Sequence, residues 1–549
     1  MRRWSLVAMG LLVAGCAQDA PPVPAGPEIQ LSGDAIRDNM RTLSSDEFMG
    51  RGPGHAGGDM AAQYIADAFQ SYGLQPVEGS YFQTVPMIGY ATDPSSVRLS
   101  FSGPGGSLPV TYLDGFVLNA GDPQATQVSG DGELVFVGYG IDAPENNWND
   151  FAGVDVAGKY ILILVNDPPA TEAEPDLFGG RAMTYYGRWT YKWEEAARQG
   201  ALGALIVHET EPAGYPWSVV RGGRSGEQFS LPPDPNAPTP AGMVGWVTRD
   251  VAAAALELAG LDFEELKAAA GARGFTAVAT GVTASAGLSA SVRQVETMNV
   301  VGLLPGSARP DEIITITSHY DHFGVGETID GDSIYNGAYD NASGTAMLME
   351  MARGFAALEV APQRSLLFIA TAAEEQGLLG AQWYVQSPLF PLNRTVAEVN
   401  VDGANLWGET NDVTIQGEER SGLGAFARVR TDEMGLTIKP DAEPEKGFFF
   451  RSDHFPFAKA GIPSLYIEHG RDYRGQPAEY GQRISDEFTA QRYHAPSDEF
   501  SEDFTFEGAV QQGMLAVRII WDIAQDSSWP NWHEGQEFKA VRDAMMGGS

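Results

Sequence analysis

The sequence predicts an α/β fold in which a mainly parallel or mixed β-sheet is sandwiched by helices, with an inserted β-rich domain. Residues 296–526 alternate strand-like runs such as DEIITITSHY and RSLLFIATA with helix-like runs such as NASGTAMLMEMARGFAAL. This alternation is typical of a parallel sheet covered by helices. Residues 131–270 are instead dominated by strands and glycine turns. A chain of 549 residues is too long for one ordinary core, so we expect more than one domain.

The N-terminus has the features of a secretory signal. Arg2 and Arg3 precede the apolar run WSLVAMGLLVAG, which ends at Cys16, the only cysteine. The string VAGC resembles a bacterial lipobox, which implies a lipoprotein signal peptide over residues 1–16 and lipidation of Cys16. The protein is then expected in the bacterial cell envelope, on the periplasmic face of the outer membrane or at the cell surface. An ordinary signal peptide is the alternative. Residues 17–28, rich in Pro and Ala, are expected to form a tether.

The charge is strongly acidic. The chain has 72 acidic and 35 basic residues, and removing Arg2 and Arg3 with the signal leaves 72 − 33 = 39 excess acids. This balance argues against nucleic acid or an anionic membrane surface as a partner, so membrane contact is expected through the N-terminal lipid only. No apolar run in the body of the chain is long enough to span a bilayer. The acidity suits a cationic substrate, although it also promotes solubility.

Two regions lie between the tether and the α/β alternation. Residues 29–130 begin with two helix-like segments around a glycine-rich turn, and we assign them to the N-terminal part of the α/β unit. In residues 131–285, GELVFVGYGI and GKYILILVND indicate strands, the second of them buried. FVGYGI, DVAGKYILI and AARQGALGALIV resemble a protease-associated (PA) domain, a small β-rich module often inserted into peptidases. Residues 286–549 are expected to complete the larger unit.

Polar residues follow the apolar strands of the predicted sheet. His319 and Asp321 end the run TITSHYDHFG, and Glu374 and Glu375 follow LLFIATAA, a strand with no polar face. Asp402 comes just after the strand in AEVNVDG. Ligand sites in open α/β sheets lie at the carboxyl ends of the strands, so we expect these side chains to meet.

Each of these residues also has a purely structural interpretation. The H-x-D pair is a common strand ending, the two glutamates suit a solvated loop, and Asp340 or Asn341 in GAYDNASG is suited to cap a helix. Tyr493 and His494 lie in the turn-rich RYHAPSDE. Together, however, they bring two histidines and, apart from Asp321, four carboxylates to one place, which is costly without a cation. Mixed imidazole and carboxylate ligands suit zinc, and two ions about 3.5–4 Å apart make a hydrolytic site.

The motifs SHYDHFG, GAYDNASG, AAEEQGLLG, NVDG, RSDHFPFAKAGIP and YHAPSDE occur in this order. Residues 296–526 therefore resemble the M28 family of di-zinc aminopeptidases, and the fold class becomes zinc aminopeptidase-like. The resemblance implies two zinc ions per chain. It makes His319 and Asp402 ligands of one ion, Glu375 and His494 ligands of the other, and Asp340 the carboxylate that bridges both.

The same resemblance implies roles for the remaining residues. Asp321 is expected to pair with the far nitrogen of His319, Glu374 to be the general base, and Tyr493 to polarise the scissile carbonyl. A cis peptide bond is expected after Asp340. If both glutamates serve one site, the strand must bend at Ala373–Glu374, because neighbouring side chains on a straight strand point apart.

The motif RSDHFPFAKAGIP is expected to line the substrate pocket, with Arg451, His454 and Phe455 near the substrate. His322 and Asp453 are left outside the ligand set. The expected function is a metallo-aminopeptidase that hydrolyses N-terminal residues from peptides with a free N-terminus. A carboxypeptidase-type or glutaminyl-cyclase-type member of the same fold and a non-catalytic receptor-like protein are the alternatives.

Overall fold

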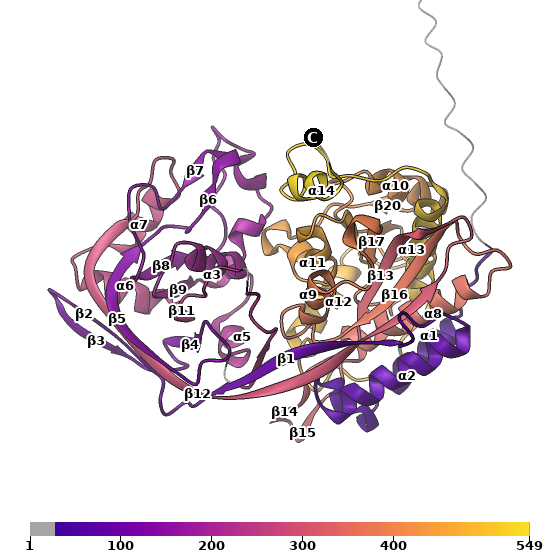
Figure 1. Ribbon diagram of the computed structural model, residues 1–549, viewed down its shortest axis with the longest axis horizontal. Coiled ribbons are helices and arrows are strands. Elements are labelled where there is room, and N and C mark those ends of the chain that lie inside the picture. The colour runs from indigo at the N-terminus through magenta and orange to yellow at the C-terminus, as the bar shows by residue number, and fades with distance from the viewer. Residues whose placement is uncertain (1–27, 225, 236, 548–549) are drawn as a thin grey trace, which may run out of the picture.

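The computed structural model describes residues 28–224, 226–235 and 237–547, which form two lobes joined by one continuous sheet (Figure 1). We call residues 93–290 the inserted lobe and the other described residues the α/β lobe. The expected signal peptide, Cys16 and all of the tether except Glu28 lie outside the described residues. Within the described part, no helix combines the length and the apolar character needed to cross a membrane.

The α/β lobe contains the predicted sheet. Its strand order is β19-β21-β17-β13-β16-β12, and β13, β16, β17 and β21 are parallel. The outer strands β19 and β12 run antiparallel to their neighbours, so the sheet is mixed, as expected. The strands are β12 (Val278–Leu304), β13 (Arg309–His319), β16 (Arg364–Thr371), β17 (Thr395–Asn400), β19 (Ile415–Gln416) and β21 (Ser464–Ile467).

Helices cover both faces of this sheet because its strands alternate apolar side chains between two cores. Ile314, Ile316 and Phe368 pack in the larger core, with α1 (Gly33–Leu43), α2 (Ala56–Tyr72), α8 (Gly344–Ala356) and α13 (Glu507–Gln525). Ile313 and Ile369 pack on the opposite face, with α9 (Leu379–Gln386), α11 (His454–Lys459) and α14 (Lys539–Met545). The remaining elements of this lobe are peripheral: α10 (Leu423–Met434), α12 (Tyr480–Gln491), β14 (Gly324–Ile329), β15 (Asp332–Tyr335), β18 (Asp412–Val413) and β20 (Thr437–Ile438).

The inserted lobe continues the same sheet in the order β12-β5-β8-β9-β11-β4, with β2 and β3 attached to β12. Its strands are β2 (Arg98–Gly103), β3 (Gly106–Val110), β4 (Phe116–Ala120), β5 (Gln127–Phe136), β6 (Asp142–Ala143), β7 (Trp148–Asn149), β8 (Tyr160–Leu164), β9 (Gly203–His208), β10 (Gln228–Ser230) and β11 (Met243–Thr248). Its helices are α3 (Trp189–Arg198), α4 (Thr210–Ala213), α5 (Trp217–Gly222), α6 (Arg249–Glu257) and α7 (Phe263–Ala270). Its identity as a PA domain stays a prediction.

The boundaries of the inserted lobe differ from the expected residues 131 and 285. Position 131 lies inside β5, and β2 to β4 hydrogen-bond to β12, to each other and to β11. Position 285 lies inside β12, a 27-residue strand that pairs with β5 and β2 in one lobe and with β16 in the other. β1 (Phe82–Thr92) pairs with β12 from Phe82 opposite Val300 to Thr92 opposite Ala290, so these two strands cross between the lobes (Figure 1).

Candidate metal centre

The predicted site lies where three parallel strands end. His319 is the last residue of β13, β16 ends at Thr371 shortly before Glu374 and Glu375, and β17 ends two residues before Asp402. β13 is hydrogen-bonded to both β16 and β17, so the three ends share one edge of the sheet. This shared edge is why polar residues far apart in the sequence meet here.

Asp340 is held by a short irregular helix between β15 and α8. The peptide bond Asp340–Asn341 is cis, as the family resemblance implied. The carboxylate of Asp498 accepts hydrogen bonds from the backbone N–H groups of Tyr339 and Asp340. α8 begins only at Gly344, after Ser343, so Asp340 is not the N-cap of this helix. The capping interpretation of Asp340 is therefore wrong.

The two carboxylate oxygens of Asp340 face two different histidines. Its Oδ1 lies 3.4 Å from Nε2 of His319, and its Oδ2 lies 3.4 Å from Nε2 of His494. His319 Nε2 is also 3.2 Å from Oδ1 of Asp402, and His494 Nε2 is 3.2 Å from Oε2 of Glu375. The arrangement has two halves, each with one histidine and one further carboxylate, and Asp340 is common to both.

His322 belongs to the cluster although we left it outside the predicted ligand set. Its Nδ1 lies 2.7 Å from Oε1 of Glu375, and ligand atoms of His322, Asp340 and Glu375 lie within 4.8 Å of one another. Its Nε2 is buried and has no hydrogen-bond partner among the described residues. The sequence signal was its position three residues after His319 in SHYDHFG. Asp453, also left out, accepts a hydrogen bond from Thr371 beneath the site.

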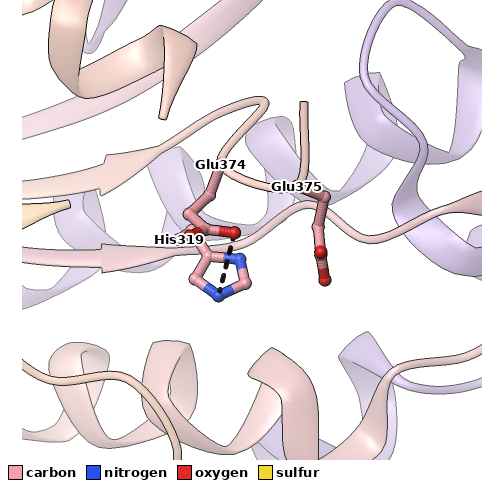
Figure 2. Close-up of side chains that lie close together, drawn as sticks. All are labelled: His319, Glu374 and Glu375. Carbon is pink, nitrogen blue, oxygen red and sulfur yellow. Dashed lines mark ion pairs between the residues drawn. The ribbon is translucent and has the colours of Figure 1, made fainter. Parts of the chain in front are cut away.

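The strand bends between Ala373 and Glu374, as predicted. β16 ends at Thr371, and Ala373 has a φ of 55°, in the left-handed region. The turn is closed by hydrogen bonds from the N–H groups of Leu379 and Gly380 to the carbonyls of Ala373 and Ala372. Figure 2 shows both glutamate carboxylates on the same side of the loop, and Oε2 of Glu374 is 4.0 Å from Nε2 of His319.

The two adjacent glutamates have opposite electrostatic surroundings. Burial raises the pKa of Glu374 well above its ordinary value; His319 opposes this rise, and the carboxylate of Glu375 adds to it. Burial alone would also raise the pKa of Glu375, but His494 and His322 outweigh it and lower the pKa to about 2. The pKa of His494 rises to about 10, because Glu375 and Asp340 outweigh the lowering by burial. The surroundings of Glu375 thus favour its charged form, while those of Glu374 make its carboxylate the better proton acceptor of the two.

Asp321 faces the far nitrogen of His319 with both its carboxylate and its backbone carbonyl, and the carbonyl is the closer of the two. Its carboxylate Oδ1 is 3.8 Å from Nδ1 of His319, whereas its backbone carbonyl oxygen is 3.3 Å from the same nitrogen. The carboxylate instead accepts a hydrogen bond of 3.0 Å from the backbone N–H of Glu374. Asp321 therefore fixes both His319, through its main chain, and the turn that carries Glu374.

Tyr493, predicted to polarise the scissile carbonyl, and the three residues predicted for the substrate pocket lie in different places. Tyr493 is 49% exposed, and its ring stacks on His494 at 3.7 Å, at the open side of the cluster. His454 and Phe455 lie in the core rather than in a pocket, with exposures of 0% and 6%. They begin the short helix α11, which turns them toward aromatic rings between the two lobes. Arg451 lies at the boundary between the lobes.

The residues present fit zinc. Three groups have ligand atoms within 4.8 Å of one another: His319, Glu374 and Glu375; His319, Asp340 and Asp402; and His322, Asp340 and Glu375. Imidazole nitrogen with carboxylate oxygen is a donor set that zinc accepts. The side chains of His319 and Glu375 are 1% and 4% exposed, so their close approach is buried and calls for a cation.

Comparisons with known proteins point to the same chemistry. Residues 299–517 match the model of Peptidase family M28. Aminopeptidase YwaD of Bacillus subtilis (strain 168) is 28% identical over 242 residues, which are 42% of this chain and 46% of that protein. A probable zinc metalloprotease of Pyrenophora teres f. teres (strain 0-1) is 34% identical over 274 residues, 42% of this chain and 52% of that protein. The chain thus spans about half the length of these curated relatives.

A solved structure shares the fold over nearly the whole chain. The aminopeptidase from Aneurinibacillus sp. strain AM-1 is 20% identical, with a TM-score of 0.51 and coverage of 91% of this chain and 96% of that one. This likeness supports the α/β fold together with its inserted lobe. Residues 299–517 thus carry the similarity to Peptidase family M28.

Proposed function

We propose that the protein is a zinc aminopeptidase that hydrolyses the first peptide bond of substrates with a free N-terminus. The observation that carries the proposal is the placement of Asp340, whose two oxygens each lie 3.4 Å from a different histidine. A carboxylate in this position suits two cations better than one. The names of the relatives, an aminopeptidase and a probable zinc metalloprotease, support the same chemistry.

The chain offers a ligand set for each of two zinc ions. His319 and Asp402 would hold one, Glu375 and His494 the other, and Asp340 would bridge them. His322 bonds to Glu375 and so fixes the orientation of that carboxylate. Bound zinc supplies a Lewis acid that polarises the peptide carbonyl and lowers the pKa of water.

Glu374 is the general base in this proposal. A carboxylate whose pKa is raised above its ordinary value by burial accepts a proton more readily and can release it again. Asp321 holds the backbone of Glu374, and Gly380 closes the turn behind it. Glu374 therefore takes the proton of the attacking water and delivers it to the leaving amine, while the half-exposed Tyr493 hydroxyl donates to the developing oxyanion.

The excess of carboxylates at the site favours a substrate with a positive end. The α-amine of a peptide is such a group, and pairing it beside the acidic cluster fixes cleavage at the first residue. A blocked N-terminus removes this charge. The preference for free over blocked peptides therefore separates an aminopeptidase from the carboxypeptidase-type and receptor-like alternatives. Release of the first residue, rather than its cyclisation, separates it from the cyclase type.

The experiment compares wild type with Glu374→Gln and with Glu359→Gln. Glu359 is exposed, so its variant is a matched surface control. Free and N-acetylated leucyl peptides are assayed with and without a chelator, and zinc is counted by mass spectrometry. We expect about two zinc ions in all three proteins, and loss of turnover only in Glu374→Gln. Normal activity of Glu374→Gln, or equal cleavage of the N-acetylated peptides, would contradict the proposal.

We further infer a lipid anchor at Cys16 in the bacterial cell envelope, with the enzyme on the periplasmic face of the outer membrane or at the cell surface. The lipobox-like VAGC string supports this inference. Expression of Cys16→Ser in a bacterial host should move the protein from the membrane fraction to the soluble fraction. Retention of the variant in the membrane fraction would contradict it.

A further inference from the structure

Two arginines lie together where the inserted lobe meets the α/β lobe. Arg188 precedes α3 in the inserted lobe, and Arg451 precedes α11 in the α/β lobe. The guanidinium of Arg451 lies 5.8 Å from the ring of Tyr215 and 5.4 Å from that of Phe448. A Cβ atom at Gly214 would be 3.3 Å from Nη2 of Arg451, so this side chain touches the inserted lobe.

Neither arginine has a charge partner among the described residues. Nε of Arg188 and both Nε and Nη2 of Arg451 are buried and make no hydrogen bond. Arg224 also lacks an acid, but its guanidinium lies 4.9 Å from each of two indole rings, Trp189 and Trp193, which satisfy a cation. Arg451 has only the more distant rings of Tyr215 and Phe448, so Arg188 and Arg451 are the less compensated pair.

Other buried arginines of the chain have hydrogen-bond or charge partners, unlike Arg188 and Arg451. Arg51 donates to four backbone carbonyls, and Arg430 pairs with Asp522. Arg364 pairs with Glu312 and donates to two carbonyls. The chain has 72 acidic residues and a formal charge of −37, so acids to pair with an arginine are abundant. Acids at the lobe boundary pair with other cations, Glu445 with Arg181 and Glu194 with Lys459, and leave this arginine pair without one.

The two side chains also repel each other. The pKa of Arg188 is lowered to about 10, mainly by burial and in part by the charge of Arg451. Two like charges in a partly buried position cost free energy that a bound anion would offset.

Arg451 of this pair lies near the candidate metal centre. Ser452, the residue after Arg451, donates a hydrogen bond of 2.5 Å to Oδ2 of Asp402. The charge of Arg451 also acts on the hydroxyl of Tyr493, whose ring stacks on His494. A molecule bound at the metal centre is therefore within reach of Arg451.

We propose that Arg188 and Arg451 bind a carboxylate of the peptide substrate while its amine lies at the acidic cluster. This rests on the proposed aminopeptidase function and adds the substrate class: short or acidic peptides. Guanidinium groups bind carboxylates through paired N–H donors, and unpaired donors are present on Arg188 (Nε) and Arg451 (Nε and Nη2). The carboxylate comes either from the C-terminus of a short peptide or from an acidic side chain.

Matched substrates separate these two sources. The first pair is leucyl-glycyl-glycine and its C-terminal amide. The second pair is leucyl-aspartyl-glycinamide and leucyl-asparaginyl-glycinamide. For the wild type we expect kcat/KM to favour the anionic member of at least one pair by roughly 10- to 100-fold, which is the range of a charge-assisted hydrogen bond. We expect most of the difference in KM, because the arginines bind substrate and do not take part in bond breaking.

Arg188→Gln and Arg451→Gln should each reduce this preference at least tenfold, while the control Arg221→Gln keeps it. Arg221 lies in the inserted lobe, as Arg188 does. It is exposed, and it pairs with Asp114 at 3.8 Å. Equal kcat/KM for the charged and neutral members of both pairs in the wild type overturns the carboxylate site. An unchanged preference in both folded variants does so as well.

A binding measurement keeps the two proposals distinguishable. Calorimetry measures how tightly zinc-loaded Glu374→Gln protein binds the two anionic peptides, leucyl-glycyl-glycine and leucyl-aspartyl-glycinamide. The same measurement is made with their neutral counterparts. If none of the free-amine peptides is hydrolysed by the wild type, the proposed function fails, and the calorimetric preference for the anionic peptides still decides the carboxylate site. Tighter binding of an anionic peptide supports the site, and equal binding within both pairs overturns it.

Discussion

Replacing Arg51 by Met should destabilise the α/β lobe and loosen the metal centre together. Arg51 is fully buried and donates hydrogen bonds of 2.6 to 2.8 Å to the carbonyls of Leu43, Tyr320, Asn336 and Gly337. Methionine fills much of the same space but donates none of these bonds. Four buried carbonyl oxygens would then lose their charged donor.

The size of the effect follows from these four bonds. A buried polar group left without its partner costs about 1–3 kcal/mol, so four carbonyls at the low end of that range give about 4 kcal/mol. We use the low end because burial of the guanidinium is itself costly and lowers the pKa of Arg51 to about 10. Tyr320 lies next to His319, and Gly337 lies three residues before Asp340, so zinc retention should fall as well.

The assay is urea unfolding followed by tryptophan fluorescence, with zinc content measured after dialysis against a weak chelator. Arg37→Met is the matched control, because Arg37 is a partly exposed residue paired with the exposed Asp34 and should change stability by less than about 1 kcal/mol. Arg51→Lys keeps the charge but not the planar fork, and should recover only part of the loss. A stability of Arg51→Met within about 1 kcal/mol of the wild type would refute the reasoning.

Three further changes test other contacts. Ser452→Ala removes the hydroxyl that donates to Asp402, and zinc affinity measured by competition with a chelator should fall about 10- to 100-fold; unchanged affinity would contradict this. Gly380→Ala places a Cβ 2.3 Å from the carbonyl oxygen of Ala372, so it should lower stability by about 1–3 kcal/mol and reduce kcat, as seen by thermal unfolding and kinetics. Burial raises the pKa of Asp150 to about 6 from 3.8, so its contribution to stability is full below about pH 4 and is lost as the pH rises through 6. A shift of about 2 units corresponds to about 3 kcal/mol, and Asp150→Asn should remove this slope from unfolding free energies measured between pH 4 and 7.

The sequence was sufficient to predict the edge of the sheet where the polar residues meet. His319, Glu374 and Asp402 each follow an apolar run, and the ends of parallel strands share one edge whatever the details of packing. The bend at Ala373 could also be predicted, because two adjacent carboxylates can serve one site only if the strand turns. Both predictions depend on which residues follow one another within a short stretch of sequence.

Contacts between distant segments were harder to predict. His322 is as polar and as close to the strand end as His319, and only the folded chain shows its bond to Glu375. His454 and Phe455 follow Arg451 in sequence, yet α11 directs them into the core. An apolar helix of this length gives no periodic signal for its buried side.

The inserted lobe is fixed against the α/β lobe, and this bears on how Arg188 and Arg451 could act. β1 and β12 form a ladder from one lobe into the other, so a hinge between the lobes would break backbone hydrogen bonds. Tyr185, three residues before Arg188, packs on Phe455 at 5.1 Å and accepts a hydrogen bond from Lys459. Arg188 is thus held beside Arg451 before any substrate arrives. A carboxylate that binds there loses less free energy to ordering the protein than one that must close two mobile lobes. The repulsion between the two arginines then lowers the stability of the free protein, and the sheet and the aromatic contacts offset this loss. A bound anion relieves the repulsion, and this relief adds to the affinity for the anion.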